Sequence, residues 1–594
     1  SDNVPGVPGI GVKTAAELIN KYGSLEKLLK STHEIKQNKR RETLTENKDK
    51  AIISKKLVTL KHDTPVKVNI SEFLLKEVEK EKLYKFLREM EFNRLLSSVI
   101  SAYGEPEFLG AEKNTQLNEN QKTINKTEYH LIKNIDEIDK WIKEAGLPLK
   151  GIRTFDHQYC HAVGAYLTSG FKGKCLVFTY DGGGDQSNGG VWLCEGGRMT
   201  HVKEFSVATD ASLGRVWMAA TEALGWKMLK DEGKVMGMAG NGEYNEFLYN
   251  TIKTLFEYNK ENCTFSPSGN GSLSTFVFNS LKEMGWCEGS KNRYDLAYNL
   301  QKYTEDIMLE IIKDFIVKWP KYSKQMCFAG GIFANVKMNY KINSLKNIDE
   351  IFVYPPMGDD GLALGSALAM AKELREWEVP KRLPNMFMGI SYSEEQIKKE
   401  ASPYNFRSIN YDPNIVASHL DGGQIGAFFK GKFEHGPRAL GARSIIVKTT
   451  EKSTHELLNT RLNRHEVMPF APMVLKDKAS EIFYGTEKSS YTAEFMTLCY
   501  LAKEEWIPKI PACIHNVDNT GRPQFVNPET NPHWYKLLKA YYDKTGIPVL
   551  LNTSFNGHGE PIVNTPTQAF EHLKNKTIDF LIVEDKIYYR NETL

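Results

Sequence analysis

The sequence predicts a multidomain α/β protein, and three observations indicate this fold class. The chain has 594 residues, too many for a single hydrophobic core and enough for about three or four domains. Hydrophobic residues make up 41% and charged residues 25%, which is ordinary for a globular protein. Between residues 175 and 365, strands run into glycine turns, and helices follow. We therefore expect several cores, each combining strands with helices.

Composition excludes two classes of protein. No apolar run approaches the roughly 18 residues that a membrane-spanning helix needs, so we do not expect a membrane protein. The eight cysteines are scattered without a CxxC pair, and no export signal is present. This pattern favours reduced thiols in the cytoplasm over a disulfide framework.

The first 60 residues indicate a polyanion partner. Gly6, Gly9 and Gly11 punctuate a turn that lets backbone N–H groups approach a phosphate, and Lys13 and Thr14 begin the next helix. A basic stretch follows from Lys36 to Lys61, although the net charge of the whole chain is only +3. We expect contacts to the DNA backbone without sequence preference. Taken alone, the same turn also fits glycines that merely pack two helices.

Ser1–Gly6 and Ser54–Leu60 resemble the 5′ nuclease domain of bacterial DNA polymerase I over residues 1–105. The resemblance implies a small all-α helix-hairpin-helix segment. Asp2 would match the last metal-binding carboxylate of that family, so we expect DNA binding without 5′–3′ exonuclease activity. Residues 106–126 indicate a polar linker. Residues 127–147 resemble the start of the same polymerase's 3′ exonuclease domain, with a strand at Tyr129–Ile132 and a helix at Ile135–Ile142.

Two histidines four residues apart, His157 and His161, are expected on one face of a helix, where both imidazoles reach one metal ion. Such a pair alone is more often an ordinary helix feature. A Gly/Asp loop follows the strand Cys175–Tyr180, and its backbone amides would line a phosphate. The alternative for this loop, Asp181–Asp185, is a hairpin turn.

Arginines in glycine-rich and proline-rich motifs suggest a phosphate site in the last third of the chain. Arg438 and Arg443 lie in Gly436–Ser444, and Arg464 and Arg522 follow. The guanidinium fork suits bidentate phosphate recognition, whereas single arginines usually form surface ion pairs. The string Leu551–Val563 adds short hydrogen-bonding groups.

These motifs, in this order, resemble the O-carbamoyltransferases of nodulation-factor and antibiotic biosynthesis over residues 148–594. The resemblance implies a truncated actin/ribonuclease-H-like domain over 148–384 and a threonylcarbamoyl-AMP synthase-like domain over 385–594. It also implies the site residues. These are metal ligands His157, His161 and Asp359; catalytic residues Arg438, Arg464, Arg522 and Ser554; and nucleotide contacts Asp181, Gly183, Asp185, Lys234, Gly330, Gly331, Asn335, Arg443, Asn552 and Asn556.

The implied reaction is ATP-dependent. Carbamoyl phosphate is converted to carbamoyl-adenylate, and the carbamoyl group then passes to a hydroxyl of a small molecule or sugar. The implied cofactors are ATP, with Mg²⁺, and a divalent metal, iron being favoured, and a homodimer is compatible. Intact family members begin with further strands, so we expect impaired activity here. The alternative is a DNA-binding polymerase fragment joined to an incomplete carbamoyltransferase without integrated activity, a chimera whose junction falls inside a domain.

Overall fold

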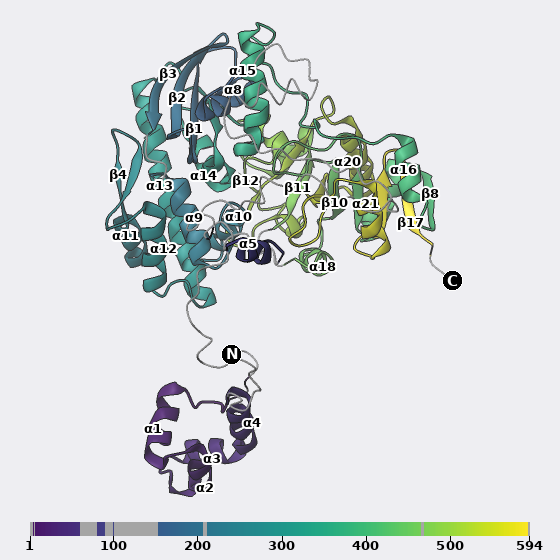
Figure 1. Cartoon of the computed structure of the whole chain (residues 1–594). Coiled ribbons are helices and arrows are strands. Elements are labelled where there is room, and N and C mark those ends of the chain that lie inside the picture. The colour runs from purple at the N-terminus through teal and green to yellow at the C-terminus, as the bar shows by residue number, and fades with distance from the viewer. Residues whose placement is uncertain are drawn as a thin grey trace. The chain divides into compact units, whose positions relative to one another are not determined.

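The computed structural model describes residues 4, 6–59, 80–89, 99, 153–205, 211–464 and 469–591. The chain forms two compact units, Ser1–Leu131 and Ile132–Leu594 (Figure 1). Asp2, the expected linker over 106–126 and the expected exonuclease-like segment over 127–147 lie outside the described residues.

The described part of the first unit is helical. Leu18, Leu28, Ile35 and Leu44 form its small core, and Ser24 caps α2 by accepting the Lys27 N–H. The elements are α1 (Val12–Tyr22), α2 (Leu25–Lys30), η1 (Thr32–Glu34), α3 (Asn38–Glu46), α4 (Lys48–Val58) and α5 (Lys80–Glu89).

The second unit contains a five-stranded sheet in the order β3-β2-β1-β6-β7. The first three strands are antiparallel, whereas β1, β6 and β7 run parallel, so the carboxyl ends of these three meet at one edge. The strands are β1 (Cys175–Gly184), β2 (Ser187–Glu195), β3 (Arg198–Phe205), β6 (Gln325–Ala329) and β7 (Glu350–Val353). Ligands of an α/β sheet usually bind beyond such an edge.

Side chains alternate between the two faces of this sheet, as the period of a strand requires. Leu176 and Phe178 point to one face, where α9, α10, α12, α13 and α14 supply the core. Cys175 and Val177 point to the other face, which α8 and α15 cover (Figure 1). The helices are α8 (His157–Ser169), α9 (Leu213–Ala223), α10 (Glu232–Ala239), α11 (Glu246–Thr254), α12 (Leu273–Glu283), α13 (Ser290–Lys318), α14 (Val336–Asn343) and α15 (Leu362–Glu373), with 3-10 turns η4 (Gly331–Ala334) and η5 (Asp359–Gly361) and a small hairpin of β4 (Phe256–Asn259) and β5 (Thr264–Pro267).

An eight-stranded sheet follows, in the order β14-β11-β15-β10-β9-β16-β17-β8. Its two faces carry separate cores, one against α16, α18 and α21 and the other against α17 and α20. Its strands are β8 (Phe406–Asn410), β9 (Gly426–Phe429), β10 (Arg443–Lys448), β11 (Ala471–Leu475), β14 (Gln524–Val526), β15 (Val549–Ser554), β16 (Phe580–Val583) and β17 (Lys586–Arg590). The helices are α16 (Glu394–Ala401), α17 (Pro413–Asp421), α18 (Ser453–Arg461), α19 (Ala479–Ile482), α20 (Pro532–Thr545) and α21 (Pro566–Lys574); η6 (Lys476–Lys478), η7 (Thr492–Phe495), η8 (Pro511–Cys513) and the pair β12 (Tyr500–Leu501) and β13 (Thr520–Gly521) complete this region.

The two sheets share buried side chains. Leu440, Tyr491 and Phe495 belong to the same core as Val163 and Phe352, and the Phe352 and Tyr491 rings stack with centroids 5.2 Å apart. The regions before and after residue 385 are therefore packed against each other, and the described part of the second unit has a mixed α/β fold.

Candidate active site

The start of α8 presents the two histidines. Asp156 caps the helix by accepting the Tyr159 N–H at 2.8 Å, so the helix begins at His157 and carries His161 one turn later. The two imidazole rings are 4.9 Å apart. The expectation that both rings lie on one helical face is correct.

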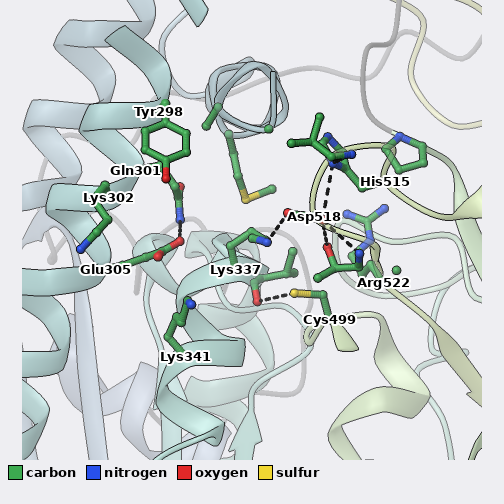
Figure 2. A pocket seen from close by; sticks show the side chains of 18 residues that line it. Tyr298, Gln301, Lys302, Glu305, Lys337, Lys341, Cys499, His515, Asp518 and Arg522 are labelled. Carbon is green, nitrogen blue, oxygen red and sulfur yellow. Dashed lines mark hydrogen bonds and ion pairs between the residues drawn. The ribbon is translucent and has the colours of Figure 1, made fainter. Parts of the chain in front are cut away.

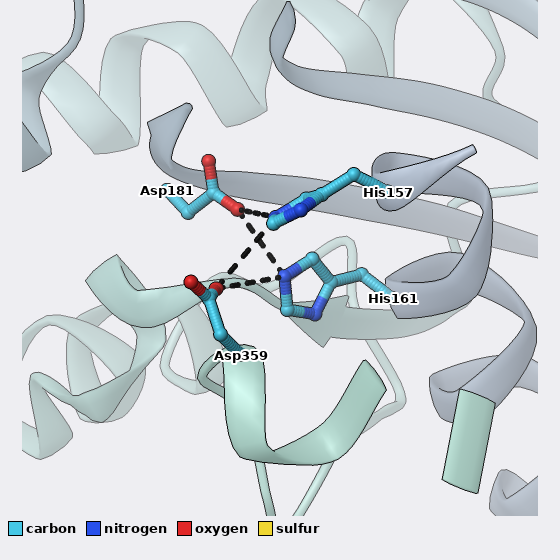
Figure 3. Close-up of side chains that lie close together, drawn as sticks. All are labelled: His157, His161, Asp181 and Asp359. Atoms are coloured by element: carbon cyan, nitrogen blue, oxygen red, sulfur yellow. Dashed lines mark hydrogen bonds and ion pairs between the residues drawn. The ribbon is translucent and has the colours of Figure 1, made fainter. Parts of the chain in front are cut away.

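Two carboxylates complete a cluster with these rings (Figure 3). Asp181 Oδ2 lies 2.9 Å from His157 Nε2 and 3.2 Å from His161 Nε2, and Asp359 Oδ1 lies 3.6 Å from each. All four ligand atoms lie within 4.8 Å of one another. The His161 side chain is fully buried whereas that of Asp359 is 73% exposed, so the cluster is open on the Asp359 side.

The close packing of α8 and α15 sets this geometry. A Cβ on Gly365 would lie 2.3 Å from the Cys160 carbonyl oxygen, so only glycine permits the contact. The Gly330 N–H donates to the Met357 carbonyl at 2.7 Å. This bond ties the end of β6 to the loop that carries Asp359.

The cluster is electrostatically coupled. Burial lowers the pKa of His157 and of His161, but hydrogen bonds and charge from Asp181 outweigh it, and the pKa of each imidazole is raised. Burial also opposes ionisation of Asp181, yet the two imidazoles hold its pKa well below the usual range. Asp181 is therefore a carboxylate at neutral pH.

The cluster fits a divalent metal ion. His161 Nδ1 has no hydrogen-bond partner among the described residues, and its Nε2 faces the carboxylates of Asp181 and Asp359. A buried imidazole in such surroundings is costly unless an ion or another ligand satisfies it. Gln158 donates to both Asp181 oxygens at 3.1 Å and accepts from Thr179 at 2.7 Å. Two imidazoles and two carboxylates with supporting hydrogen bonds are a common donor set for transition metals.

Asp181 is the candidate ligand that sequence reasoning missed, because we assigned it to a phosphate loop. The structure has the alternative, a β-hairpin: β1 extends to Gly184, and Asp185 and Gln186 turn into β2 with φ of 48° and 76°. Gly183 N–H donates to Asp181, and Asp185 accepts the His157 N–H at 2.9 Å. The sequence did carry one signal for this role. Asp181 follows a predicted strand directly, and in a parallel sheet such a carboxylate lies at the same edge as the loop that carries Asp359.

Two other expected nucleotide contacts of this region, Asn335 and Lys234, have partners within the protein. Asn335 caps α14 and exchanges two hydrogen bonds with Gln301. Gly331 has open space around it, and Lys234 forms an ion pair with Asp231 at 2.9 Å.

A cavity of about 720 Å³ gathers most of the other expected residues. Its lining includes Lys234, Arg438, Arg464, Arg522, Asn552, Ser554 and Asn556. Arg464 donates to Thr553, Ser554 and Asn556, mostly near 3 Å. Asn552 is buried and donates to the Ala439 carbonyl at 3.0 Å, which holds the loop that carries Arg438.

Arg438 forms no ion pair within the part of the chain that the structure describes. Its Nε is buried without a hydrogen-bond partner among the described residues. The neighbouring charge of Arg522 and then burial lower the pKa of Arg438 well below its ordinary value. Two guanidiniums held this close favour an anionic ligand between them.

Arg443, another expected nucleotide contact, points into the fold. Its guanidinium is fully buried, stacks on Phe429 at 3.7 Å, and donates to the carbonyls of Lys430, Gly431 and Ala442. Arg443 begins β10 and points into the fold, whereas Arg438 lies on the loop before it.

A smaller cavity of about 220 Å³ adjoins the first, because Met236, Pro469 and Arg522 line both. Figure 2 shows its walls, with Tyr298, Gln301 and Glu305 from α13 facing His515 and Asp518. Lys337 of α14 forms an ion pair with Asp518. Asp518 also accepts the N–H and hydroxyl of Thr520, two residues before Arg522.

The glycines expected to bind DNA lie before α1. Gly6 and Gly9 have φ of 60° and 74°, the Gly6 N–H donates to Ser54 Oγ, and Gly11 is the N-cap of α1. Lys13 and Thr14 fall in the first turn of that helix.

Two family models match the chain. The Carbamoyltransferase N-terminus matches residues 34–368, and the Carbamoyltransferase C-terminus matches residues 417–590. The chain belongs to the carbamoyltransferase family. It is an enzyme of carbamoyl transfer, as we expected from its motifs. The N-terminal match also extends over residues that we assigned to a polymerase fragment, an assignment that stays a prediction.

Several curated proteins are similar to this carbamoyltransferase. An uncharacterized protein of Methanocaldococcus jannaschii is 33% identical over 74% of each chain. Nodulation protein NolO of Bradyrhizobium diazoefficiens is 30% identical, over 72% of this chain and 77% of the relative. Nodulation protein U of Azorhizobium caulinodans is 26% identical, over 76% of this chain and 80% of the relative.

Among solved structures, full-length HypF in a phosphate- and nucleotide-bound form is 15% identical, covers 35% of this chain and 29% of HypF, and has a TM-score of 0.23. A similarity of this extent supports no inference about fold or ligand. Within the described residues, no helix is long and apolar enough to cross a membrane.

Proposed function

We propose that this carbamoyltransferase forms carbamoyl-adenylate from carbamoyl phosphate and ATP, and passes the carbamoyl group to a hydroxyl-bearing small molecule or sugar. The observation that carries the proposal is the 720 Å³ cavity, where Arg438 and Arg522 lie close together with Arg464, Ser554 and Asn556 beside them. Arginines that line a cavity in this way suit ligands with several phosphate oxygens.

Each residue has a proposed role. Arg438 and Arg522 offset phosphate charge as pyrophosphate leaves ATP, and Ser554 and Asn556 donate to the carbamoyl or phosphate oxygens. Arg464 is already bonded to Ser554 and Asn556, so it also orients them. Lys234 and Asn552 line the same cavity and are proposed nucleotide contacts. We also propose contacts to nucleotide from Asp185, Gly183, Gly330, Gly331 and Asn335, but no longer from Arg443.

Transfer is proposed at the other site. His157, His161, Asp181 and Asp359 would hold a divalent ion, with iron favoured by the resemblance. When bound, such an ion supplies Lewis acidity toward the adenylate phosphate. The acceptor oxygen attacks the carbamoyl carbon, the bond to the adenylate oxygen breaks, AMP leaves, and the hydroxyl proton is lost to water.

Exchange of labelled pyrophosphate into ATP tests the first step. We expect exchange that depends on carbamoyl phosphate, and Arg438→Ala should reduce it about 10- to 100-fold, the loss of one charge-assisted hydrogen bond. Arg407→Ala is the control, because Arg407 lies on the edge strand β8 over Tyr589. Absence of exchange, or equal exchange in the two variants, would contradict the proposal.

A second candidate function is DNA binding by the first unit without integrated activity. The basic stretch and the glycine turn before α1 support it. Residence in the cytoplasm and a homodimer also stay predictions.

A further inference from the structure

The loop that joins α9 to α10, Gly225–Asp231, lines the 720 Å³ cavity and has no role in the reaction so far. Its residues Trp226, Lys227 and Lys230 belong to the lining, together with Lys234 in the first turn of α10. Lys227 and Lys230 are exposed, and neither forms an ion pair within the described part of the chain. Both ammonium groups are therefore available to a ligand of the cavity.

Two carboxylates fix the backbone of this loop. Asp231 is 9% exposed, accepts the Lys227 N–H at 3.1 Å and forms an ion pair with Lys234 at 2.9 Å. Glu232 accepts the Leu229 N–H at 2.6 Å. The loop therefore cannot move away from the start of α10 without losing these bonds.

The tip and the base of the loop are also constrained. Leu229 is 77% exposed and has a φ of 62°, a left-handed conformation that is unfavourable for a bulky side chain. Arg293 of α13 lies over the Trp226 ring at 5.1 Å and donates to the Leu224 carbonyl at 2.7 Å. Backbone strain that the surroundings hold in place is typical of loops that bind a ligand. These contacts keep Lys227 and Lys230 at the cavity.

The charge of the lining indicates what the cavity binds. Two carboxylates, Asp231 and Glu560, stand against six cationic side chains. The six are Lys227, Lys230, Lys234, Arg438, Arg464 and Arg522. An excess of this size suits a ligand with several phosphate groups better than a ligand with a single phosphate.

The cations lie at different depths. The Nε of Arg438 is buried, whereas Lys227 and Lys230 are exposed. When ATP reacts, the attacking and leaving oxygens lie roughly in line, on opposite sides of the phosphorus. With the carbamoyl donor beside Ser554 and Asn556, the leaving pyrophosphate then points toward the open side of the cavity.

We propose that Lys227 and Lys230 bind the β- and γ-phosphates of ATP and hold them as pyrophosphate leaves. The inference rests on the proposed function, because it assigns a subsite within the cavity of that reaction. Binding of pyrophosphate alone can be measured without the reaction, so the two are tested separately.

Isothermal titration calorimetry on the full-length chain tests the subsite, with inorganic pyrophosphate, inorganic phosphate and carbamoyl phosphate as separate probes. We expect pyrophosphate to bind the double variant Lys227→Gln, Lys230→Gln at least about tenfold more weakly than the wild type, because two charged contacts are lost. Carbamoyl phosphate and inorganic phosphate should bind both proteins alike. The control is the double variant Lys253→Gln, Lys313→Gln, which removes two exposed lysines of α11 and α13 that line neither cavity described above.

Exchange kinetics give a second readout. In Lys227→Gln, Lys230→Gln, the KM for pyrophosphate should rise about tenfold, while the KM for carbamoyl phosphate, the melting temperature and the metal content keep their wild-type values.

The proposal is overturned if the wild type binds no pyrophosphate, if the two double variants bind it alike, or if the affinity for carbamoyl phosphate falls as much as that for pyrophosphate. Lysine-dependent binding of pyrophosphate without any exchange in the wild type would remove the proposed reaction and keep the subsite. Exchange with wild-type constants in Lys227→Gln, Lys230→Gln would keep the reaction and remove the subsite.

Discussion

At the scale of single residues, the least expected finding is that Asp181 completes the candidate metal cluster. Its carboxylate contacts both imidazoles and is fixed by Gln158. Charge near a metal ion is most effective when the ligand cannot rotate away, and here the supporting hydrogen bonds come from a buried amide.

We predict that Asp181→Asn and Asp359→Asn each lower metal affinity at least about tenfold, because each removes an anionic donor. Elemental analysis and competition with a chelator measure this. Asp360→Asn is the control, since Asp360 is the exposed neighbour of Asp359 in the same loop. Equal metal content in Asp181→Asn and Asp360→Asn would show that Asp181 is not a metal ligand.

His533 gives a prediction for pH dependence. Burial, and then the charge of Lys430, lower the pKa of His533 to about 4. The unfolded state binds the proton more readily, so stability is fully present above the ordinary histidine pKa and is lost as pH falls toward 4, by about 3 kcal/mol in total. In His533→Phe, the melting temperature should depend less on pH between pH 6.5 and 4 than it does in the wild type. A variant that keeps the wild-type slope would assign the pH dependence to other groups.

How much the sequence reveals differs from residue to residue. His157 and His161 follow from helical spacing, which is local. Asp181 and Asp359 are far apart in sequence, and only the parallel order of β1, β6 and β7 brings them together. Arg438 and Arg443 look alike in sequence, since both lie in glycine-rich surroundings. Only the start of β10 at Arg443 shows which one is buried.

At the scale of elements, a helix that packs on the five-stranded sheet contacts a loop near the eight-stranded sheet. Lys337 of α14 reaches Asp518, and Thr520 bonds to the same carboxylate two residues before Arg522. The loop with Arg522 is therefore anchored from outside its own sheet. The resemblance implies a separate domain over residues 385–594, and this anchor argues that such a fragment alone would form carbamoyl-adenylate less actively than the whole chain.

We predict that Lys337→Met and Asp518→Asn each reduce pyrophosphate exchange about tenfold and leave metal content unchanged. Losing one partner leaves the other partly buried without its counter-charge, and the loop loosens. The double variant should be no worse than either single one, because both break the same bond. Lys341→Met is the control on the same helix. Additive effects would show that the ion pair does not act as a unit.

The α8–α15 contact gives a second prediction at this scale. Gly365→Ala should lower the free energy of unfolding by about 1–3 kcal/mol through overpacking, and should also lower metal content, because the helix with both histidines is displaced. Gly331→Ala is the control for stability, since a Cβ there meets no atom within 4 Å. Thermal melting and elemental analysis measure both effects. An unchanged melting temperature for Gly365→Ala would mean that α8 and α15 can move apart without a loss of stability.

At the scale of the whole molecule, the two units differ in chemistry. The second unit contains both candidate catalytic sites, and the match to the carbamoyltransferase C-terminus lies entirely within it. The first unit is helical in its described part and is basic from Lys36 onward. The domain bounds that composition and motif order indicate stay predictions, whereas the packing of the two sheets against each other depends on long-range contacts that a single sequence does not show.

We predict that the full-length chain binds duplex or flapped DNA weakly, without sequence preference and without cutting it. Contacts with about four phosphates would give a slope near −4 for the logarithm of affinity against the logarithm of salt concentration. Fluorescence anisotropy across a salt series measures the slope, with a magnesium-dependent cleavage assay beside it.

The triple variant Lys39→Gln, Lys48→Gln and Lys50→Gln should reduce affinity and make the slope shallower by up to about three, since each lysine lost releases one counterion fewer. The same number of exposed lysines removed from the second unit, Lys253→Gln, Lys313→Gln and Lys346→Gln, controls for net charge. If both triple variants weaken binding equally, the DNA is held by overall charge and the glycine turn before α1 has no special part in it.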